Sequence, residues 1–166
     1  MSEPLPPLSI EADSPPSFDT LDHGILHEFV GMYLRVAYEE AYADFARRLG
    51  DEALRPGYFT ILTLVVHNPR ITQTQIGMAS ERDKTNVTNA LRWMEDQGLI
   101  RRYLAANDRR THMCVATEAG RQMQARMQAK AVVHLAALND AIGAERRADF
   151  IRTLKDMIAA LRAGKR

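Results

Sequence analysis

The sequence has one cysteine, a net charge of only +1 and no long apolar run. A single cysteine, Cys114, excludes an internal disulfide and a zinc site built from cysteines. No apolar run approaches the roughly 20 residues that a membrane-spanning helix requires, and no charged start followed by an apolar core indicates a signal peptide. The sequence also lacks a G-x-S-x-G, a phosphate loop and an H-E-x-x-H motif. We therefore expect a cytoplasmic protein that is not an enzyme, uses no cofactor and binds no membrane.

Basic residues are concentrated in the middle of the chain. Residues 82–110 carry seven basic groups against four acidic ones, whereas residues 1–34 carry six acidic groups and no lysine or arginine. A locally basic segment in a near-neutral chain fits contact with a polyanion. Residues 121–166 carry ten basic groups against four acidic ones, and solvated helix faces explain that excess equally well.

The N-terminal segment differs in composition from the rest. Five of the seven prolines lie in the first 17 residues, among serine and acidic side chains. Such a segment buries too little apolar surface to offset its ordering entropy, so we predict a disordered tail over residues 1–18. The remaining residues, 19–166, have the length of one domain.

Apolar spacing predicts four helices before residue 98. The first two cover residues 19–49 and 56–68. Two short helices follow, over 73–80 and 84–97, with Thr72 and Asp83 as their N-cap residues. The last of these has an apolar stripe of Val87, Ala90, Leu91 and Met94. Two short helices with a tight link predict a helix-turn-helix.

A β-hairpin and two more helices are predicted after it. Residues 100–105 and 111–117 are strand candidates, joined by residues 106–110. A long helix over 118–142, starting after Thr117, ends at Gly143, and a last helix covers 144–163. The fold class is therefore mostly α with a small β-hairpin wing. A winged helix-turn-helix over about 55–117 is flanked by dimerisation helices over 19–49 and 118–163.

The helix over 84–97 presents an unusual polar face. A solvated face is more often rich in glutamate and lysine, whereas small polar groups that hydrogen-bond base edges, and cations that meet phosphates, predominate here. Backbone N–H groups at the start of the preceding helix are suited to anchoring a phosphate. The predicted DNA contacts from the two helices are Thr72, Gln73, Thr74, Lys84, Thr85, Asn86, Thr88, Asn89 and Arg92.

The hairpin resembles the wing signature of MarR/SlyA-type transcriptional regulators. The matching residues are Asp108, Arg110, Thr117 and Gly120, with Ala116 where the family usually has leucine. The helix DKTNVTNALRWMEDQGLI resembles the family's recognition helix, with Asn89 where arginine is common.

The resemblance implies a homodimer on double-stranded DNA. Its terminal helices interlock, and two winged lobes meet a pseudo-palindromic operator with half-sites roughly 10 base pairs apart. The recognition helix enters the major groove and Arg110, held by Asp108, enters the minor groove. Arg109 meets a phosphate. Of Arg101 and Arg102, one is expected to face phosphate and the other solvent.

Family members usually respond to a small molecule bound between the dimer helices and the winged lobe. The candidate lining is aromatic and hydroxyl-bearing with one cation, which suits an aromatic carboxylate, its thioester or a phenolic compound. It comprises His27, Tyr33, Arg35, Tyr38, Tyr42, Tyr58 and Phe59. Aromatic side chains at helical spacing are equally typical of a packed core.

The expected function is a ligand-responsive repressor, and two alternatives remain open. His23 and His27 have the i, i+4 spacing of a metal-binding pair, which would suit a metal-responsive regulator of the same fold. The second alternative is a winged helix used only for protein interaction. Cys114, in the second wing strand, is expected to pack as a small apolar side chain and not to sense oxidants. The sequence does not identify the operator, the regulated genes or the effector, nor does it distinguish a repressor from an activator.

Overall fold

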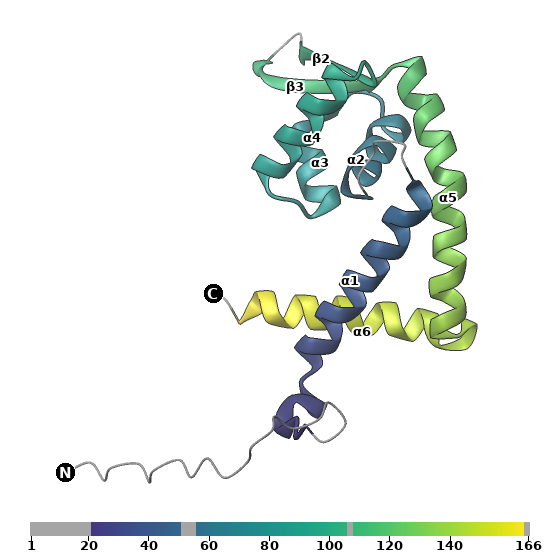
Figure 1. Cartoon of the computed structure of the whole chain (residues 1–166). Coiled ribbons are helices and arrows are strands. Elements are labelled where there is room, and N and C mark those ends of the chain that lie inside the picture. Colours follow the sequence, from purple (N-terminus) through teal and green to yellow (C-terminus); the bar gives the residue numbers. More distant parts are fainter. Residues whose placement is uncertain (1–20, 51–55, 106–107, 165–166) are drawn as a thin grey trace, which may run out of the picture. The chain divides into compact units, whose positions relative to one another are not determined.

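The computed structural model describes residues 21–50, 56–105 and 108–164 (Figure 1). The predicted tail over 1–18 lies outside these residues. The chain divides into two compact units, residues 1–37 and 38–166. None of the helices in the described ranges is long and apolar enough to span a bilayer.

The first helix is shorter than predicted. A 3₁₀-helix, η2 (Gly24–Glu28), precedes α1 (Val30–Leu49), so the prediction of one helix over 19–49 is wrong in its first part. Phe29, with φ −79° and ψ 85°, has a non-helical backbone and separates the two. The Asp22 carboxylate accepts a hydrogen bond from the first N–H of η2 at 2.8 Å. This local bond competes with regular helix, as aspartate side chains commonly do.

Three helices follow where the apolar spacing predicts them. They are α2 (Pro56–His67), α3 (Gln73–Ser80) and α4 (Lys84–Asp96). The Thr72 hydroxyl accepts the N–H of Gln75, and the Gln75 side chain accepts the N–H of Thr72, which forms a complete capping box at α3.

The wing contains three strands. β1 (Ile71–Thr72), β2 (Ile100–Ala105) and β3 (Asp108–Ala116) form an antiparallel sheet in the order β1-β3-β2. β1 was not predicted, because two residues are too few to show a period. β3 begins at Asp108 and not at residue 111, so the backbone of residues 108–110 belongs to the strand.

The long helix α5 (Glu118–Ile142) starts where β3 ends. The Thr117 hydroxyl caps it by accepting the N–H of Gly120 at 3.1 Å, and its single proton is shared between the carbonyl oxygens of Gly98 at 2.7 Å and Leu99 at 3.1 Å. A Cβ at Gly120 would lie 2.0 Å from the Leu99 oxygen, so only glycine fits there. This explains why the predicted wing signature ends in glycine.

The end of α1 is anchored to the middle of α5. Asp44 accepts a hydrogen bond from Arg48 at 2.7 Å, and its Oδ2 lies 2.7 Å from Nδ1 of His134. The pKa of the Asp44 carboxyl is lowered, chiefly by the bond from Arg48. The Lys130 ammonium donates to the carbonyl oxygen of Leu49 at 2.8 Å, which satisfies the C-terminal end of α1.

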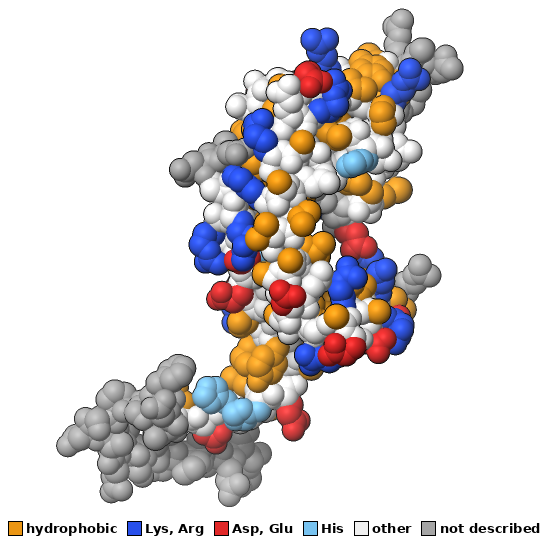
Figure 2. All heavy atoms as spheres, turned by 90° about the vertical axis from the view of Figure 1, so that its right-hand side faces the viewer, with side chains coloured by type: hydrophobic (Ala, Val, Ile, Leu, Met, Phe, Trp, Pro, Cys, Tyr) orange, Lys and Arg blue, Asp and Glu red, His pale blue; other side chains and the backbone are white. Residues whose placement is uncertain are grey.

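The hydrophobic core lies in the winged lobe. All four predicted stripe residues of α4 are buried, as are Ile61 and Leu62 of α2, Ile76 of α3 and Met127 of α5. By contrast, α5 and α6 (Ala144–Ala163) leave apolar side chains uncovered. Those exposed by more than a third include Leu135, Leu138, Phe150, Ile151, Ile158 and Leu161. Hydrophobic side chains are also spread down the face that α5 presents in Figure 2.

Met94 and Met78 provide a matched test of this core. Met94 is 0% exposed and Met78 is 75% exposed. Met94→Ala should lower the free energy of unfolding by about 2–5 kcal/mol, because it removes buried methylene groups and leaves a cavity. Met78→Ala should change it by less than about 0.5 kcal/mol. Urea denaturation followed by circular dichroism measures both, and equal losses would contradict the assigned core.

Candidate nucleic-acid interface

A short turn joins α3 to α4. Glu81 ends α3 in the left-handed conformation, with φ 53°, and donates its N–H toward the carbonyl oxygens of Gly77 and Met78. Asp83 then caps α4 by accepting the N–H of Asn86 at 2.9 Å. Hydrogen bonds from Asn86 to the Asp83 carboxylate hold its pKa below the ordinary value. The two helices are thus joined as a helix-turn-helix.

The predicted contact residues of α4 share one surface. Lys84, Thr85, Asn86, Asn89 and Arg92 are exposed, and Thr88 is half-buried. The buried stripe of α4 lies on the opposite side of the helix. Two of these side chains are already engaged within the lobe: Asn86 donates to the Asp83 carboxylate, and Thr88 is bonded to Gln73 of α3.

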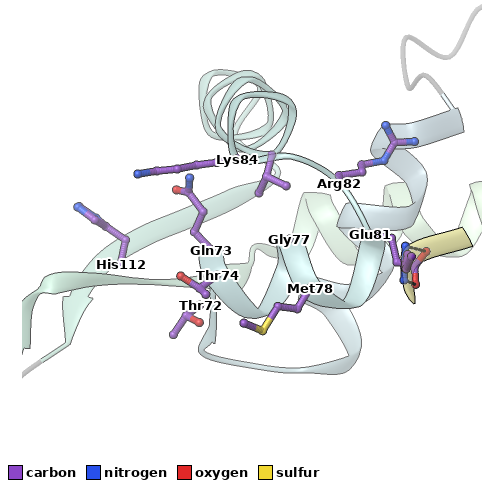
Figure 3. A pocket seen from close by; sticks show the side chains of 11 residues that line it. Thr72, Gln73, Thr74, Gly77, Met78, Glu81, Arg82, Lys84 and His112 are labelled. Atoms are coloured by element: carbon purple, nitrogen blue, oxygen red, sulfur yellow. Dashed lines mark hydrogen bonds and ion pairs between the residues drawn. The ribbon is translucent and has the colours of Figure 1, made fainter. Parts of the chain in front are cut away.

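A groove of about 1040 Å³ runs between α3, α4 and the wing. Figure 3 shows Gln73, Lys84 and His112 extending toward the same open space, with Thr72 and Thr74 beside them. The structure therefore gathers the predicted residues at the start of α3 with Lys84 of α4. Cationic and polar side chains surround a concave surface here, a suitable shape for an anionic ligand.

Three basic side chains that line this groove, Arg82, His112 and Arg162, were not predicted as site residues. Arg82 was counted only in the basic segment, and His112 was not assigned to the interface. Arg162, near the end of α6, pairs with Glu81 at 3.2 Å, between nitrogen and carboxylate oxygen. Residues 81 and 162 are far apart in the chain, so no local sequence signal could have indicated that contact.

The tip of the wing is only partly described. The backbone of Asp108, Arg109 and Arg110 lies in β3, but their side chains are outside the described part. The predicted pairing of Asp108 with Arg110 therefore stays a prediction.

Arg102 does not face phosphate or solvent as expected. Its guanidinium binds the Glu95 carboxylate through Nε at 2.8 Å and through a second nitrogen, and its backbone N–H donates to the same carboxylate at 3.2 Å. The expectation for the Arg101 and Arg102 pair is thus wrong for Arg102, because Glu95 of α4 faces β2. Arg101 is exposed. The Arg102–Glu95 pair fastens the wing to the recognition helix.

The predicted effector residues fall in both compact units. In the first, the Tyr33 hydroxyl donates to the carbonyl oxygen of His27 at 3.3 Å, and Arg35 is exposed. In the second, Tyr38 and Tyr42 are exposed on α1, with ring centroids 6.0 Å apart.

Tyr58 and Phe59 are the remaining members of this set. Both pack against the core, Tyr58 on Trp93 at 5.4 Å and Phe59 edge-on to Phe45 at 5.6 Å, between ring centroids. These contacts support the core-packing interpretation of the two residues.

His23, His27 and Cys114 are the remaining candidates for a sensor. The rings of His23 and His27 lie 5.4 Å apart, and no cluster of three or more His, Cys, Asp or Glu suited to a metal occurs within the described ranges. Cys114 is buried, as expected, and its burial raises the pKa of the thiol to about 11. At neutral pH it is therefore an unreactive thiol.

The Arg102–Glu95 pair predicts a pH dependence of stability. Hydrogen bonds from Arg102 lower the pKa of the Glu95 carboxyl, against the opposing effect of burial. A lowered pKa stabilises the fold above the unfolded value, about 4.3, and the stabilisation is lost as the pH falls through the folded value. Glu95→Gln should be less stable than the wild type at pH 7, and the difference should shrink as the pH falls below about 4.

Urea denaturation between pH 3 and pH 7 measures this effect. Arg102→Gln should show the same weakened dependence of the free energy of unfolding on pH as Glu95→Gln, because it removes the same pair. Arg101→Gln, on the exposed side of the same strand, should keep the wild-type profile. A constant difference between Glu95→Gln and wild type across this range would refute the assignment.

Comparison with known proteins agrees with this architecture. Residues 54–112 match the family model described as the MarR family. A putative transcriptional regulatory protein for the hcr operon of Thauera aromatica is 29% identical over 109 residues, which cover 65% of this chain and 66% of that protein. The aligned stretch is thus just under two thirds of that relative.

Solved structures extend the likeness over most of the chain. The transcriptional repressor CouR, bound to a 23-mer DNA duplex, is 28% identical, with a TM-score of 0.76 over 83% of this chain and 98% of CouR. The PcaV transcriptional regulator of Streptomyces coelicolor, 17% identical, has a TM-score of 0.76 over 85% of this chain and 99% of PcaV, and shows the shared fold. With its winged helix-turn-helix between long terminal helices, the chain is similar to transcriptional regulators of the MarR family, by the family model over residues 54–112 and by the CouR fold over most of its length.

Proposed function

We propose that this protein is a ligand-responsive DNA-binding repressor that acts as a homodimer and is released by a small effector. The exposed polar face of α4 carries the proposal, because a buried apolar stripe on the opposite side holds it outward. CouR, similar over most of the chain, is a repressor bound to duplex DNA. The protein's proposed role is binding in the cytoplasm, without catalysis.

DNA engagement follows from the positions of α4 and the wing. The polar face of α4 enters the major groove, where amide and hydroxyl groups hydrogen-bond base edges. Lys84 and the start of α3 meet the phosphate backbone around the groove described above. Arg110 enters the adjacent minor groove, where a narrow A·T tract attracts a guanidinium.

Uncovered apolar surface supports the homodimer. α5 and α6 expose leucine, isoleucine and phenylalanine side chains that a second copy would bury. Large exposed apolar surfaces on a globular chain typically mark interfaces. Two-fold symmetry of the dimer then matches a pseudo-palindromic operator.

The proposed effector is an aromatic acid or its thioester. Its candidate lining within the second compact unit is Tyr38 and Tyr42, whose rings are exposed on α1. A second CouR structure, 27% identical to this chain, is bound to p-coumaroyl-CoA, the thioester of an aromatic acid. Since α5 begins directly after β3, a shift of α5 on effector binding would reach the wing through Thr117. The effector would favour lobe positions that do not match the operator.

The two alternatives, a protein-interaction module and a metal-responsive regulator, require different functional residues. A protein-interaction module predicts apolar or acidic groups on the recognition face, and α4 presents threonine, asparagine and lysine there. A metal-responsive regulator would use His23 and His27, whose ring centroids lie 5.4 Å apart.

The wing assignment predicts a loss of DNA affinity in Arg110→Ala. Removing a specific arginine contact should weaken operator binding by about 1–3 kcal/mol. Wild-type affinity for DNA should also fall steeply with salt. If six to ten phosphates are contacted, it should fall by a factor of roughly 10³–10⁵ between 50 and 200 mM salt. Gel-shift titration on promoter DNA measures both, with Arg146→Ala on α6 as the control that keeps wild-type affinity. Salt-independent binding, or unchanged affinity in Arg110→Ala, would defeat the assignment.

The effector class predicts a thermal shift. An aromatic acid or its thioester, at a hundredfold excess over its Kd, should stabilise the protein by about 2.7 kcal/mol, because it binds only the folded state. The same compound should release the duplex in a gel shift. Release by zinc instead, abolished in His23→Ala, would favour the metal-responsive alternative.

A further inference from the structure

We infer that the polar face of the recognition helix has two separate tasks. Thr88, bonded to Gln73, positions α4 against α3, and the bases are read by Thr85, Asn89 and Arg92. The base-reading part rests on the proposed DNA-binding function. The positioning part concerns the free protein and does not.

The link between the helices is a chain of two hydrogen bonds. Gln73 Nε2 donates to Thr88 Oγ1 at 2.7 Å, and Thr88 Oγ1 donates to the carbonyl oxygen of Lys84 at 2.7 Å. Gln73 and Thr88 are both half-buried. A threonine hydroxyl has one proton, and here that proton is committed within the protein. Thr88 therefore has no donor left to offer a base.

This link complements an apolar contact between the same helices. Ile76 of α3 and Val87 of α4 are both fully buried in the same hydrophobic core. Apolar contacts are non-directional, whereas hydrogen bonds require a defined distance and angle. The Gln73–Thr88 bond thus fixes the rotation of α4 about its axis, and with it the direction in which the polar face points.

Three other side chains of α4 differ from Thr88 because they remain available to a partner. Thr85, Asn89 and Arg92 follow each other at i, i+4 and i+7, so they form one row along the helix. All three are exposed, and their side chains make no hydrogen bond or ion pair with the groups that the structure describes. Asn86, at the edge of the row, is instead occupied by Asp83.

The chemistry of this row suits base recognition. Asparagine forms a bidentate contact with adenine, and arginine forms one with guanine. Threonine hydrogen-bonds a base edge or packs its methyl group on thymine. The half-site should therefore contain an adenine opposite Asn89 and a guanine opposite Arg92.

A double-mutant cycle on the free protein tests the positioning role. Thr88→Val and Gln73→Leu should each lower Tm by about 2–4 °C, and the double variant by no more than either single change, because one bond is lost in all three. Thr88→Ser, which keeps the hydroxyl, should retain the coupling. Thr85→Val, a matched exposed change on the same helix, should leave Tm within about 2 °C of the wild type. Additive losses in the double variant would overturn the role of Thr88.

Selection from a randomised duplex library tests the division of tasks. Thr88→Val should weaken binding about three- to tenfold on every duplex without changing base preference, and Asn89→Ala should lose preference at a single position. A preference altered at one base by Thr88→Val would refute the inference. If the wild type selects no duplex, the proposed function fails, whereas the cycle on the free protein still decides the role of Thr88.

Discussion

The apolar stripe of α4 is completely withdrawn from solvent, packed among side chains of α2, α3 and α5, and the whole winged lobe is arranged around it. Burying each of its larger side chains contributes roughly 1.5–3 kcal/mol. Because a helix has fixed angular spacing, burial of one side forces the other side outward. The same interaction that holds the lobe together therefore presents the polar residues of α4 to a partner.

Polar contacts then determine how the neighbouring elements sit on that helix. Gln73 links α3 to α4, and Arg102 links β2 to α4 through Glu95, so both α3 and the wing are attached to the recognition helix. Thr117 extends this body into α5 by bonding the Gly98 and Leu99 carbonyl oxygens. The close approach of Gly120 to Leu99 leaves no room for a side chain at that junction.

Local features of the lobe could be predicted because their causes are local. N-cap chemistry involves residues within one helical turn, and the caps at Thr72 and Asp83 were predicted from the sequence and are present. The α4 stripe repeats with the helical period and is buried as predicted. The start of α1 was predicted less well, because the apolar spacing continues through Phe29 although its backbone is not helical.

The sequence by itself thus determined the helix boundaries of the lobe, its buried stripe and the polar face opposite. Only the tertiary structure decided which polar residues are occupied within the lobe. Arg102 has its partner seven residues away and Thr88 has one fifteen residues away, and β1 exists only because it pairs with β3. Such contacts depend on which elements pack together, and that information is spread over the whole chain and not contained in any local pattern.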